Sequence, residues 1–362
     1  MFRTIVRTFS KHKYNKVGLI GVPFEKGQQK KGVALGPKVI RDAGLIKELE
    51  VLGLDVKDYG DIIYKMAGTC NVNNMTHLGD VAACTKLLSE QVQKILKDDR
   101  CVLTLGGDHS VSIGTIDGHV QAMEDVAVLW IDAHADLNTN KTSESGNVHG
   151  MPVALLTTEL SDYWPHLPGM DWQKPMLVLY IISLTSLIYV LFCERICRRC
   201  IYTYRLSIRN VAYIGLRSVD RYERLVIEKF GIPAFGMEDV ERFGIHNTIS
   251  MALDKIDPDG VKSLHVSFDI DSLDPLEAPS TGTAVRGGLS LREAIHMMEE
   301  IHRTRRLNAI DLVEVNPHIG DQRDVRLTVE AAIFIIQAAL GYTRRGLKVP
   351  EGVTDMPLQT FK

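Results

Sequence analysis

The sequence is poor in cysteine and nearly balanced in charge. Its 362 residues include six cysteines, of which Cys70, Cys84 and Cys101 are scattered along the chain. Scattered thiols favour a reducing compartment over a disulfide framework. The formal net charge of −3 provides no basic surface for nucleic acid, so we expect no nucleic-acid partner. No internal repeat or low-complexity tract is visible, which argues against a repeat architecture.

The residues that are abundant predict a packed α/β protein. Apolar residues make up 45% of the chain and charged residues 24%, as in globular domains with a core. Short β-branched runs, typical of buried strands, alternate with longer segments of helical periodicity. The strand-like runs are 17–20, 101–105, 126–131, 211–214, 264–268 and 309–313, and the helix-like segments include 79–97, 292–303 and 328–340. This alternation predicts a three-layer α/β/α fold with a mostly parallel central sheet.

Two clusters of acidic residues and histidine follow predicted strands. They are Asp132, His134 and Asp136 after the run 126–131, and Asp269 and Asp271 after the run 264–268. If the extended backbone continues through each cluster, alternate side chains point the same way. The carboxyl ends of parallel strands meet at one edge of a sheet, so both clusters are expected in one site. Carboxylates packed this closely repel one another unless cations neutralise them, which predicts a binuclear metal centre that activates water.

A third segment adds another imidazole to this predicted centre. His109 follows Gly106 and Gly107, just after the strand-like run 101–105, and glycine allows close approach of the backbone. Hard oxygen donors with a few imidazoles suit Mn²⁺ better than zinc, so we predict two Mn²⁺ ions per subunit. A lone Asp-x-Asp pattern is more often a turn or a helix cap, and the prediction depends on all three segments occurring together.

Two further residues carry potential chemistry. His149 lies in the segment 143–150, which is rich in small polar residues, and a histidine there can move protons near neutral pH. Glu314 ends the strand-like run 309–313, where its carboxylate could pair with a cationic substrate. The alternatives are a structural histidine in a turn and an ordinary charge at a strand end.

With these residues in view, the chain resembles the arginase family of the ureohydrolase superfamily. The resemblance runs from about residue 16 to about residue 345, apart from one insertion. Its motifs are GVPF at 21–24, GGDHS at 106–110, DAHAD at 132–136, SGNVHG at 145–150, GLRSVD at 215–220, SFDIDSLDP at 267–275, STGTAVRGG at 280–288 and EVNP at 314–317. Their order, spacing and identity all agree with the family pattern.

The resemblance implies the arginase fold and a hydrolase that cleaves the guanidinium group of L-arginine to urea and L-ornithine. One manganese ion would be held by His109, Asp132, Asp136 and Asp269, and the other by Asp132, His134, Asp269 and Asp271. Water activated between the ions would attack the guanidinium carbon. In the same way, Asp136 would orient that water, Glu314 would hold the guanidinium group and His149 would help to protonate the leaving amine.

The resemblance also suggests how the amino-acid end of the substrate is bound. The implied substrate-binding residues are Asn138, Ser143, Ser145, Asn147, Asp220, Glu223 and Thr283. An agmatinase has no carboxylate to recognise, so this loop favours L-arginine, and agmatinase or another guanidino-hydrolase is the alternative. Arginases usually carry Asp where this chain has Ser218, and the loss of that charge is expected to weaken the amino-group pocket without affecting the metals.

Two segments stand outside the family pattern. Residues 1–15 are basic and free of acid, a composition typical of a mitochondrial targeting segment, so the location is expected to be mitochondrial or cytoplasmic. Residues 16–362 then form one ureohydrolase domain, interrupted at about 176–205 by a hydrophobic insertion. A single membrane span there would separate the two metal-binding clusters, so we expect no spanning segment. The insertion leaves open a catalytically impaired protein, and the resemblance implies a homo-oligomer, usually a trimer.

Overall fold

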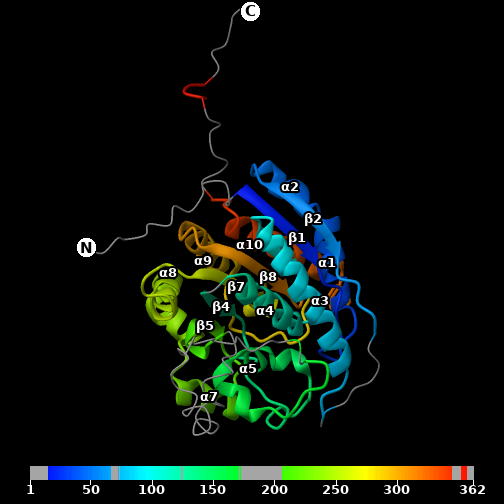
Figure 1. Ribbon diagram of the computed structural model, residues 1–362. Helices are drawn as coiled ribbons and strands as arrows, with labels where there is room; N and C mark the ends of the chain where they lie inside the picture. Colours follow the sequence, from blue (N-terminus) through cyan, green and yellow to red (C-terminus); the bar gives the residue numbers. More distant parts are fainter. Residues whose placement is uncertain are drawn as a thin grey trace, which may run out of the picture.

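The computed structural model describes residues 15–66, 72, 74–123, 125–170, 172, 206–344 and 352–356. Its centre is one eight-stranded sheet in the order β2-β1-β3-β8-β7-β4-β5-β6, in which every pair of neighbouring strands is parallel (Figure 1). The strands are β1 (Lys16–Gly21), β2 (Asp55–Asp61), β3 (Cys101–Leu105), β4 (Val126–Ile131), β5 (Val211–Leu216), β6 (Ala234–Gly236), β7 (Ser263–Asp269) and β8 (Leu307–Val313). The predicted parallel sheet is therefore confirmed.

Helices cover both faces of this sheet. One face carries α1 (Gly36–Asp42), α2 (Leu45–Val51), α8 (Met237–Ile256), α9 (Leu291–Arg303) and α10 (Gln322–Ala339). The other carries α3 (Leu78–Lys97), α4 (Ser112–Ala122), α5 (Pro152–Leu156) and α7 (Arg221–Phe230). Because successive side chains in a strand point to opposite faces, Leu103 packs in the first core and its neighbour Val102 in the second. Apolar runs buried on both faces are typical of parallel sheets.

Side-chain caps decide where several helices begin. Asp220 opens α7, Ser290 opens α9 and Asp321 opens α10, each as the first member of a capping box. Each cap accepts hydrogen bonds from backbone amides that the first turn cannot satisfy. Helix α10 therefore starts at Gln322 and not at the predicted residue 328, because its charged first turn hides the apolar periodicity. The cap of α7 also fixes Asp220 at the edge of the sheet where the predicted site lies.

Strands β2 and β6 were absent from the sequence-based prediction. The sequence of β2, DVKDYGD, is mostly exposed, and β6 has only three residues. Both lie at the edges of the sheet. An edge strand has only one neighbouring strand and is less covered by helices, so its side chains need not be apolar. The strength of the apolar pattern thus falls from the middle of the sheet to its margins.

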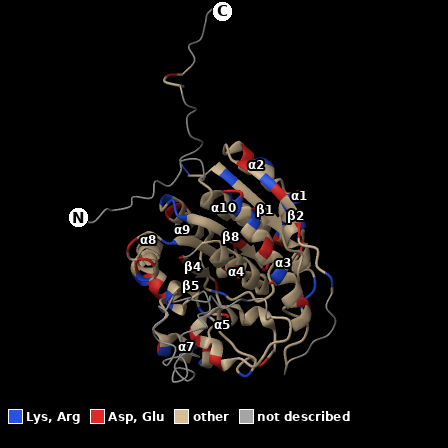
Figure 2. Cartoon of the chain, viewed as in Figure 1, with Lys and Arg blue, Asp and Glu red and all other residues tan. Residues whose placement is uncertain are grey.

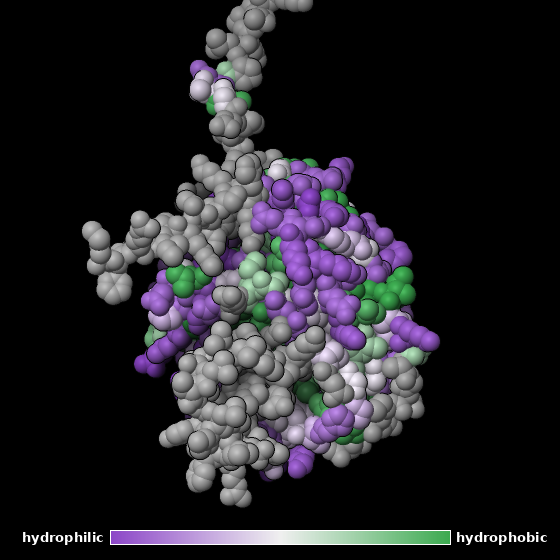
Figure 3. Space-filling model, viewed as in Figure 1, coloured by the Kyte–Doolittle hydropathy of each residue, from purple (hydrophilic) through white to green (hydrophobic). Residues whose placement is uncertain are grey.

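Charged and apolar residues are distributed over the surface of the described residues without a large patch of one kind in the view shown. Basic and acidic residues are interspersed over the outer helices (Figure 2), and hydrophobic residues appear only in small patches among hydrophilic ones (Figure 3). Among the residues that the structure describes, no helix has the length and apolar character needed to cross a membrane. The predicted targeting segment, apart from residue 15, and the insertion at 176–205 lie outside the described residues.

Candidate metal centre and active site

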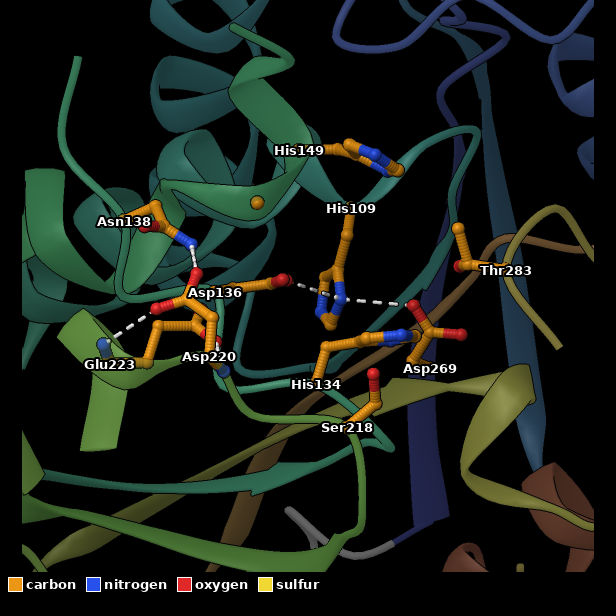
Figure 4. A pocket seen from close by; sticks show the side chains of 11 residues that line it. His109, His134, Asp136, Asn138, His149, Ser218, Asp220, Glu223, Asp269 and Thr283 are labelled. Carbon is orange, nitrogen blue, oxygen red and sulfur yellow. Dashed lines mark hydrogen bonds and ion pairs between the residues drawn. The ribbon is translucent and has the colours of Figure 1, made fainter. Parts of the chain in front are cut away.

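The predicted site residues gather at the carboxyl edge of the sheet. A cavity of about 220 Å³ opens there, formed by the loops that follow β3, β4, β5 and β7. Its lining includes His109, His134, Asp136, Asn138, His149, Ser218, Asp220, Glu223, Asp269 and Thr283 (Figure 4). Asp132, Asp271 and Glu314 are almost fully buried next to these residues. Parallel sheets bind ligands at this edge, which is where the strand ends in the sequence predict the site.

His109 faces three carboxylates. Its Nδ1 atom lies 3.0 Å from Asp132 Oδ2, 3.3 Å from Asp136 Oδ2 and 3.1 Å from Asp269 Oδ2. None of these contacts has hydrogen-bond geometry, and Nδ1 is buried without a hydrogen-bond partner. The opposite ring nitrogen, Nε2, lies 2.9 Å from Ser267 Oγ. If Nε2 donates its proton to that hydroxyl, the lone pair of Nδ1 is free for a cation.

His134 forms a second cluster with two carboxylates. Its Nδ1 atom lies 3.4 Å from Asp132 Oδ1 and 3.2 Å from Asp271 Oδ2. The two oxygens of Asp132 therefore face different histidines, and the carboxylate belongs to both candidate metal-binding groups. One carboxylate between two groups of ligands is what a bridged pair of cations requires. These buried donors, including an unpartnered imidazole nitrogen, fit a binuclear metal site.

Turns, not continued strands, bring the ligands together. Strand β4 ends at Ile131, and Asp132 Oδ1 accepts a 2.7 Å hydrogen bond from the amide of His134. Strand β7 ends at Asp269, whose Oδ1 accepts a 2.8 Å hydrogen bond from the amide of Asp271. Both clusters thus use the same turn, in which a carboxylate holds the amide two residues later. The expectation of alternating strand geometry was wrong, although its consequence, convergence on one site, holds.

Burial and neighbouring charges shift the pKa values of the carboxylates and histidines in these two clusters. Burial raises the pKa of Asp136 and Asp269, and the like charge of neighbouring carboxylates raises it further. Burial opposes the charging of His109 and His134, but the adjacent Asp132 raises the pKa of His109 to about 9 and that of His134 to about 12. Buried carboxylates that resist ionisation need positive charge nearby, and divalent cations would supply it.

Several residues that support the ligands were not predicted from the sequence. The ring of His109 stacks on Trp130 with centroids 4.1 Å apart, and Trp130 Nε1 donates a 3.0 Å hydrogen bond to Asp132 Oδ2. Arg217 Nη2 donates a 2.6 Å hydrogen bond to the carbonyl of Asp271, and the same guanidinium group binds four more backbone carbonyls. No spacing rule reveals these partners, because each acts through a fold-dependent contact.

His149 and Glu314 form a pair beside the ligands. His149 Nδ1 lies 2.8 Å from Glu314 Oε1, which also accepts a 2.9 Å hydrogen bond from the amide of His109. Burial opposes both charges, yet their mutual attraction lowers the pKa of Glu314 and raises that of His149. Glu314 has φ 64°, a left-handed conformation that is uncommon outside glycine. The backbone therefore accepts strain that aims this carboxylate at His149.

The proposed substrate residues fall into two groups. Asn138, Asp220, Glu223 and Thr283 line the cavity. Asn138 Nδ2 donates a 2.7 Å hydrogen bond to Asp220 Oδ2, and Thr283 Oγ1 donates one of 2.9 Å to Asp271 Oδ2. Thr283 thus contacts a candidate metal ligand as well as the cavity.

Three other residues proposed to bind substrate are not part of that lining. Ser143, Ser145 and Asn147 lie farther along the loop after β4 and are absent from the residues that form the cavity wall. Ser143 Oγ and Ser145 Oγ are 3.4 Å apart. Gly146, which follows Ser145, has φ 71°, and a Cβ atom there would lie 2.2 Å from the carbonyl oxygen of Asn74. This loop therefore requires glycine at its turn.

The comparison with known proteins agrees with this geometry. The model of the Arginase family matches residues 15–341. The chain belongs to the arginase family. Among its curated arginase relatives, human "Arginase-2, mitochondrial" is 39% identical over 96% of this chain and 90% of its own length. The hepatic arginase of Aquarana catesbeiana is 38% identical over 92% of this chain and 97% of its own length.

Solved arginase structures share the fold. The arginase of Bacillus subtilis is 32% identical, with a TM-score of 0.74 over 91% of this chain and 99% of that chain. The Entamoeba histolytica arginase, solved in complex with L-ornithine, is 29% identical, with a TM-score of 0.71 and coverage of 91% and 99%. A binuclear metal site is general in the arginase family, and the two clusters around Asp132 are the candidate ligands for it here.

Proposed function

We propose that this chain hydrolyses L-arginine to urea and L-ornithine with two Mn²⁺ ions per subunit. The observation that carries the proposal is the pair of histidine–carboxylate clusters that share Asp132 beside a polar cavity. Oxygen donors outnumber imidazoles in this set, which favours manganese over zinc. The relatives named arginase support the reaction, and the structure from Entamoeba histolytica contains the expected product.

The proposed ligands divide between two ions. His109, Asp132, Asp136 and Asp269 would hold one, and Asp132, His134, Asp269 and Asp271 would hold the other. When bound, such ions lower the pKa of water and so provide a nucleophile at neutral pH. Asp136 lines the cavity and lies 3.3 Å from His109 Nδ1, where its second oxygen can orient the attacking water. Its left-handed backbone, with φ 49°, directs the side chain to that position.

The pair formed by His149 and Glu314 would handle charge and protons. Glu314 is 2% exposed and places its negative charge beside the cavity, where it attracts the guanidinium group. Because Glu314 raises the pKa of His149, the imidazole stays protonated to higher pH than usual. It can then deliver a proton to the departing amine, which leaves as L-ornithine.

The polar residues at the mouth of the cavity would hold the amino-acid end. Asn138, Asp220, Glu223 and Thr283 are proposed for this role because they line the cavity. Ser143, Ser145 and Asn147 are proposed to contact the substrate carboxylate from the outer loop. Ser218 also lines the cavity and contributes a hydroxyl where arginases usually have a carboxylate. Asp220 and Glu223 are the carboxylates that remain for the α-amino group.

The reaction is tested by urea release from manganese-incubated full-length protein, with L-arginine and agmatine assayed side by side. Agmatine lacks the carboxylate that the outer loop is proposed to bind. Ser145 is exposed and Ser143 and Asn147 are half-buried, so water can replace the missing carboxylate. Hydrogen bonds to a charged group contribute about 1.5–3 kcal/mol, so L-arginine should be preferred by about 10- to 100-fold. Equal or faster release from agmatine would move the assignment to agmatinase.

We further propose that the insertion at 176–205 is dispensable to a single ureohydrolase domain. Deleting it and joining the ends with a short Gly-Ser linker should increase solubility, because a long apolar segment is removed. Manganese content and urea release per chain should be unchanged or higher. Loss of manganese from the deletion variant would show instead that the segment is needed for the fold, and a linker of twice the length controls for strain at the junction.

The arginase relatives also suggest where the protein is located in the cell and how its subunits assemble. We propose a mitochondrial or cytoplasmic protein whose residues 1–15 form the targeting segment, since the human and rat relatives carry "mitochondrial" in their names. We also propose a homo-oligomer, a trimer by family resemblance.

A further inference from the structure

A second cluster of metal-binding side chains lies on the outer helices, away from the sheet edge that carries the first. It consists of His246 on α8 and of His296 and Glu300 on α9. His296 and Glu300 are four residues apart, so they share one face of α9. Helices α8 and α9 pack side by side on the same face of the sheet (Figure 1). The three side chains therefore meet across a helix–helix contact.

The spacing of these atoms suits a small tetrahedral ion. His246 Nδ1 lies 3.7 Å from Glu300 Oε1, and His296 Nε2 lies 3.8 Å from the same oxygen. Ligands at about 2.0–2.1 Å from a tetrahedral Zn²⁺ are roughly 3.3 Å apart, so shifts of a few tenths of an ångström would close the site. The two imidazole rings are already adjacent, with centroids 5.7 Å apart.

The ring of His296 is held from the side away from Glu300. Its Nδ1 atom accepts a 3.5 Å hydrogen bond from Arg344 Nη2 and lies 3.7 Å from Glu299 Oε2. Arg344 Nη2 also donates a 3.0 Å hydrogen bond to Glu299 Oε2. A neutral imidazole that accepts at Nδ1 carries its proton on Nε2, so zinc binding at Nε2 would release that proton.

The backbone of α8 also contributes to the arrangement. Gly244 has φ 72° and ψ 152°, so the helix is interrupted two residues before His246. Only glycine adopts such angles readily. The interruption changes the direction of the second half of α8. His246 lies in the first turn after it and contacts Glu300 on α9.

A neighbouring cation competes for the same oxygen. Arg303 Nη1 forms an ion pair with Glu300 Oε1. The Arg303 side chain is 56% exposed, and exposed ion pairs contribute little free energy. A divalent ion held by two imidazoles can therefore displace it.

We propose that His246, His296 and Glu300 form a mononuclear Zn²⁺ site that links α8 to α9. Two imidazoles and one carboxylate are a recurring zinc donor set, with a fourth position left for water. The proposal concerns residues that take no part in the proposed hydrolysis, so it stands or falls independently of that function. Bound zinc would add a coordination link between two helices that otherwise meet by packing and by the contact between His246 and Glu300.

The test uses full-length protein saturated with Mn²⁺, so that the first centre is filled, and then dialysed against micromolar Zn²⁺. Zinc per chain and the shift in melting temperature on adding zinc are both measured. The wild type should retain one more zinc ion per chain than His246→Ala, and zinc should raise its melting temperature more. His246 is 62% exposed, so its removal should leave folding intact. Glu300→Gln should lose the same ion.

Two further variants sharpen the result. Arg303→Ala removes the competing cation and should bind zinc at lower concentration than the wild type. His166→Ala removes an exposed histidine elsewhere on the surface and should behave as the wild type. Equal zinc uptake and equal melting shifts in the wild type and His246→Ala would overturn the proposal. Weaker zinc binding by Arg303→Ala would also contradict it.

Discussion

Replacing Asp132 with alanine will abolish tight binding of both metal ions and lower urea release from L-arginine by about 10³-fold or more. The reason is that the two oxygens of this carboxylate face His109 at 3.0 Å and His134 at 3.4 Å. One substitution therefore removes a ligand from both clusters, and losing a single preorganised charge from an active site costs on the order of 10²–10³-fold. Metal content per chain and the initial rate of urea release measure the two effects.

The matched control for this substitution is Asp125→Ala. Asp125 is exposed and precedes the first residue of β4, so it lies at the opposite end of the same strand from Asp132. This variant should keep its metal content and its rate. If Asp132→Ala retained two manganese ions and a normal rate, the assignment of the shared ligand would be wrong.

Replacing His149 with alanine will lower the turnover number by about 10²–10⁴-fold, the usual contribution of a general acid or base. Metal content should not change, because His149 contacts Glu314 and not the candidate ligands' side chains. In the wild type, Glu314 raises the pKa of His149, so the proton donor persists to higher pH than in an ordinary histidine and is lost as pH rises further. The variant's pH–rate profile should lack this alkaline decline.

The control for His149 is His318→Ala. His318 is also a histidine in a loop beyond a strand end, but it is exposed and absent from the cavity lining. It should retain the wild-type rate and pH profile. A normal turnover number for His149→Ala at every pH would remove the histidine from proton transfer, and lowered manganese content would indicate a structural role.

The central strands could be predicted from the sequence because each is buried on both faces. Strands β4 and β8 are fully buried along their length. Burial leaves a continuous apolar run in β4 and an apolar run in β8 that is interrupted by Asn308 and Asp311. The same rule placed the polar residues after each run at one edge of the sheet. Convergence of His109, Asp132 and Asp269 thus followed from strand ends alone.

The local geometry of the site could not be predicted in that way. The turns at Asp132 and Asp269 are set by hydrogen bonds from amides two residues later, and the left-handed backbone at Glu314 is imposed by its surroundings. The support that Arg217 gives to the carbonyl of Asp271 joins segments 54 residues apart. Such contacts exist only once the chain has folded, so no local pattern records them.

The order of the strands has a consequence for how this protein comes apart. The strands that precede His109, Glu314, Asp269 and Asp132 are β3, β8, β7 and β4, which are consecutive neighbours in the middle of the sheet. Fraying of the outermost β2 or β6 leaves these four strands paired. Release of the metals by unfolding therefore requires the cooperative opening of the whole centre, and bound ions would slow the exchange of its most protected amides.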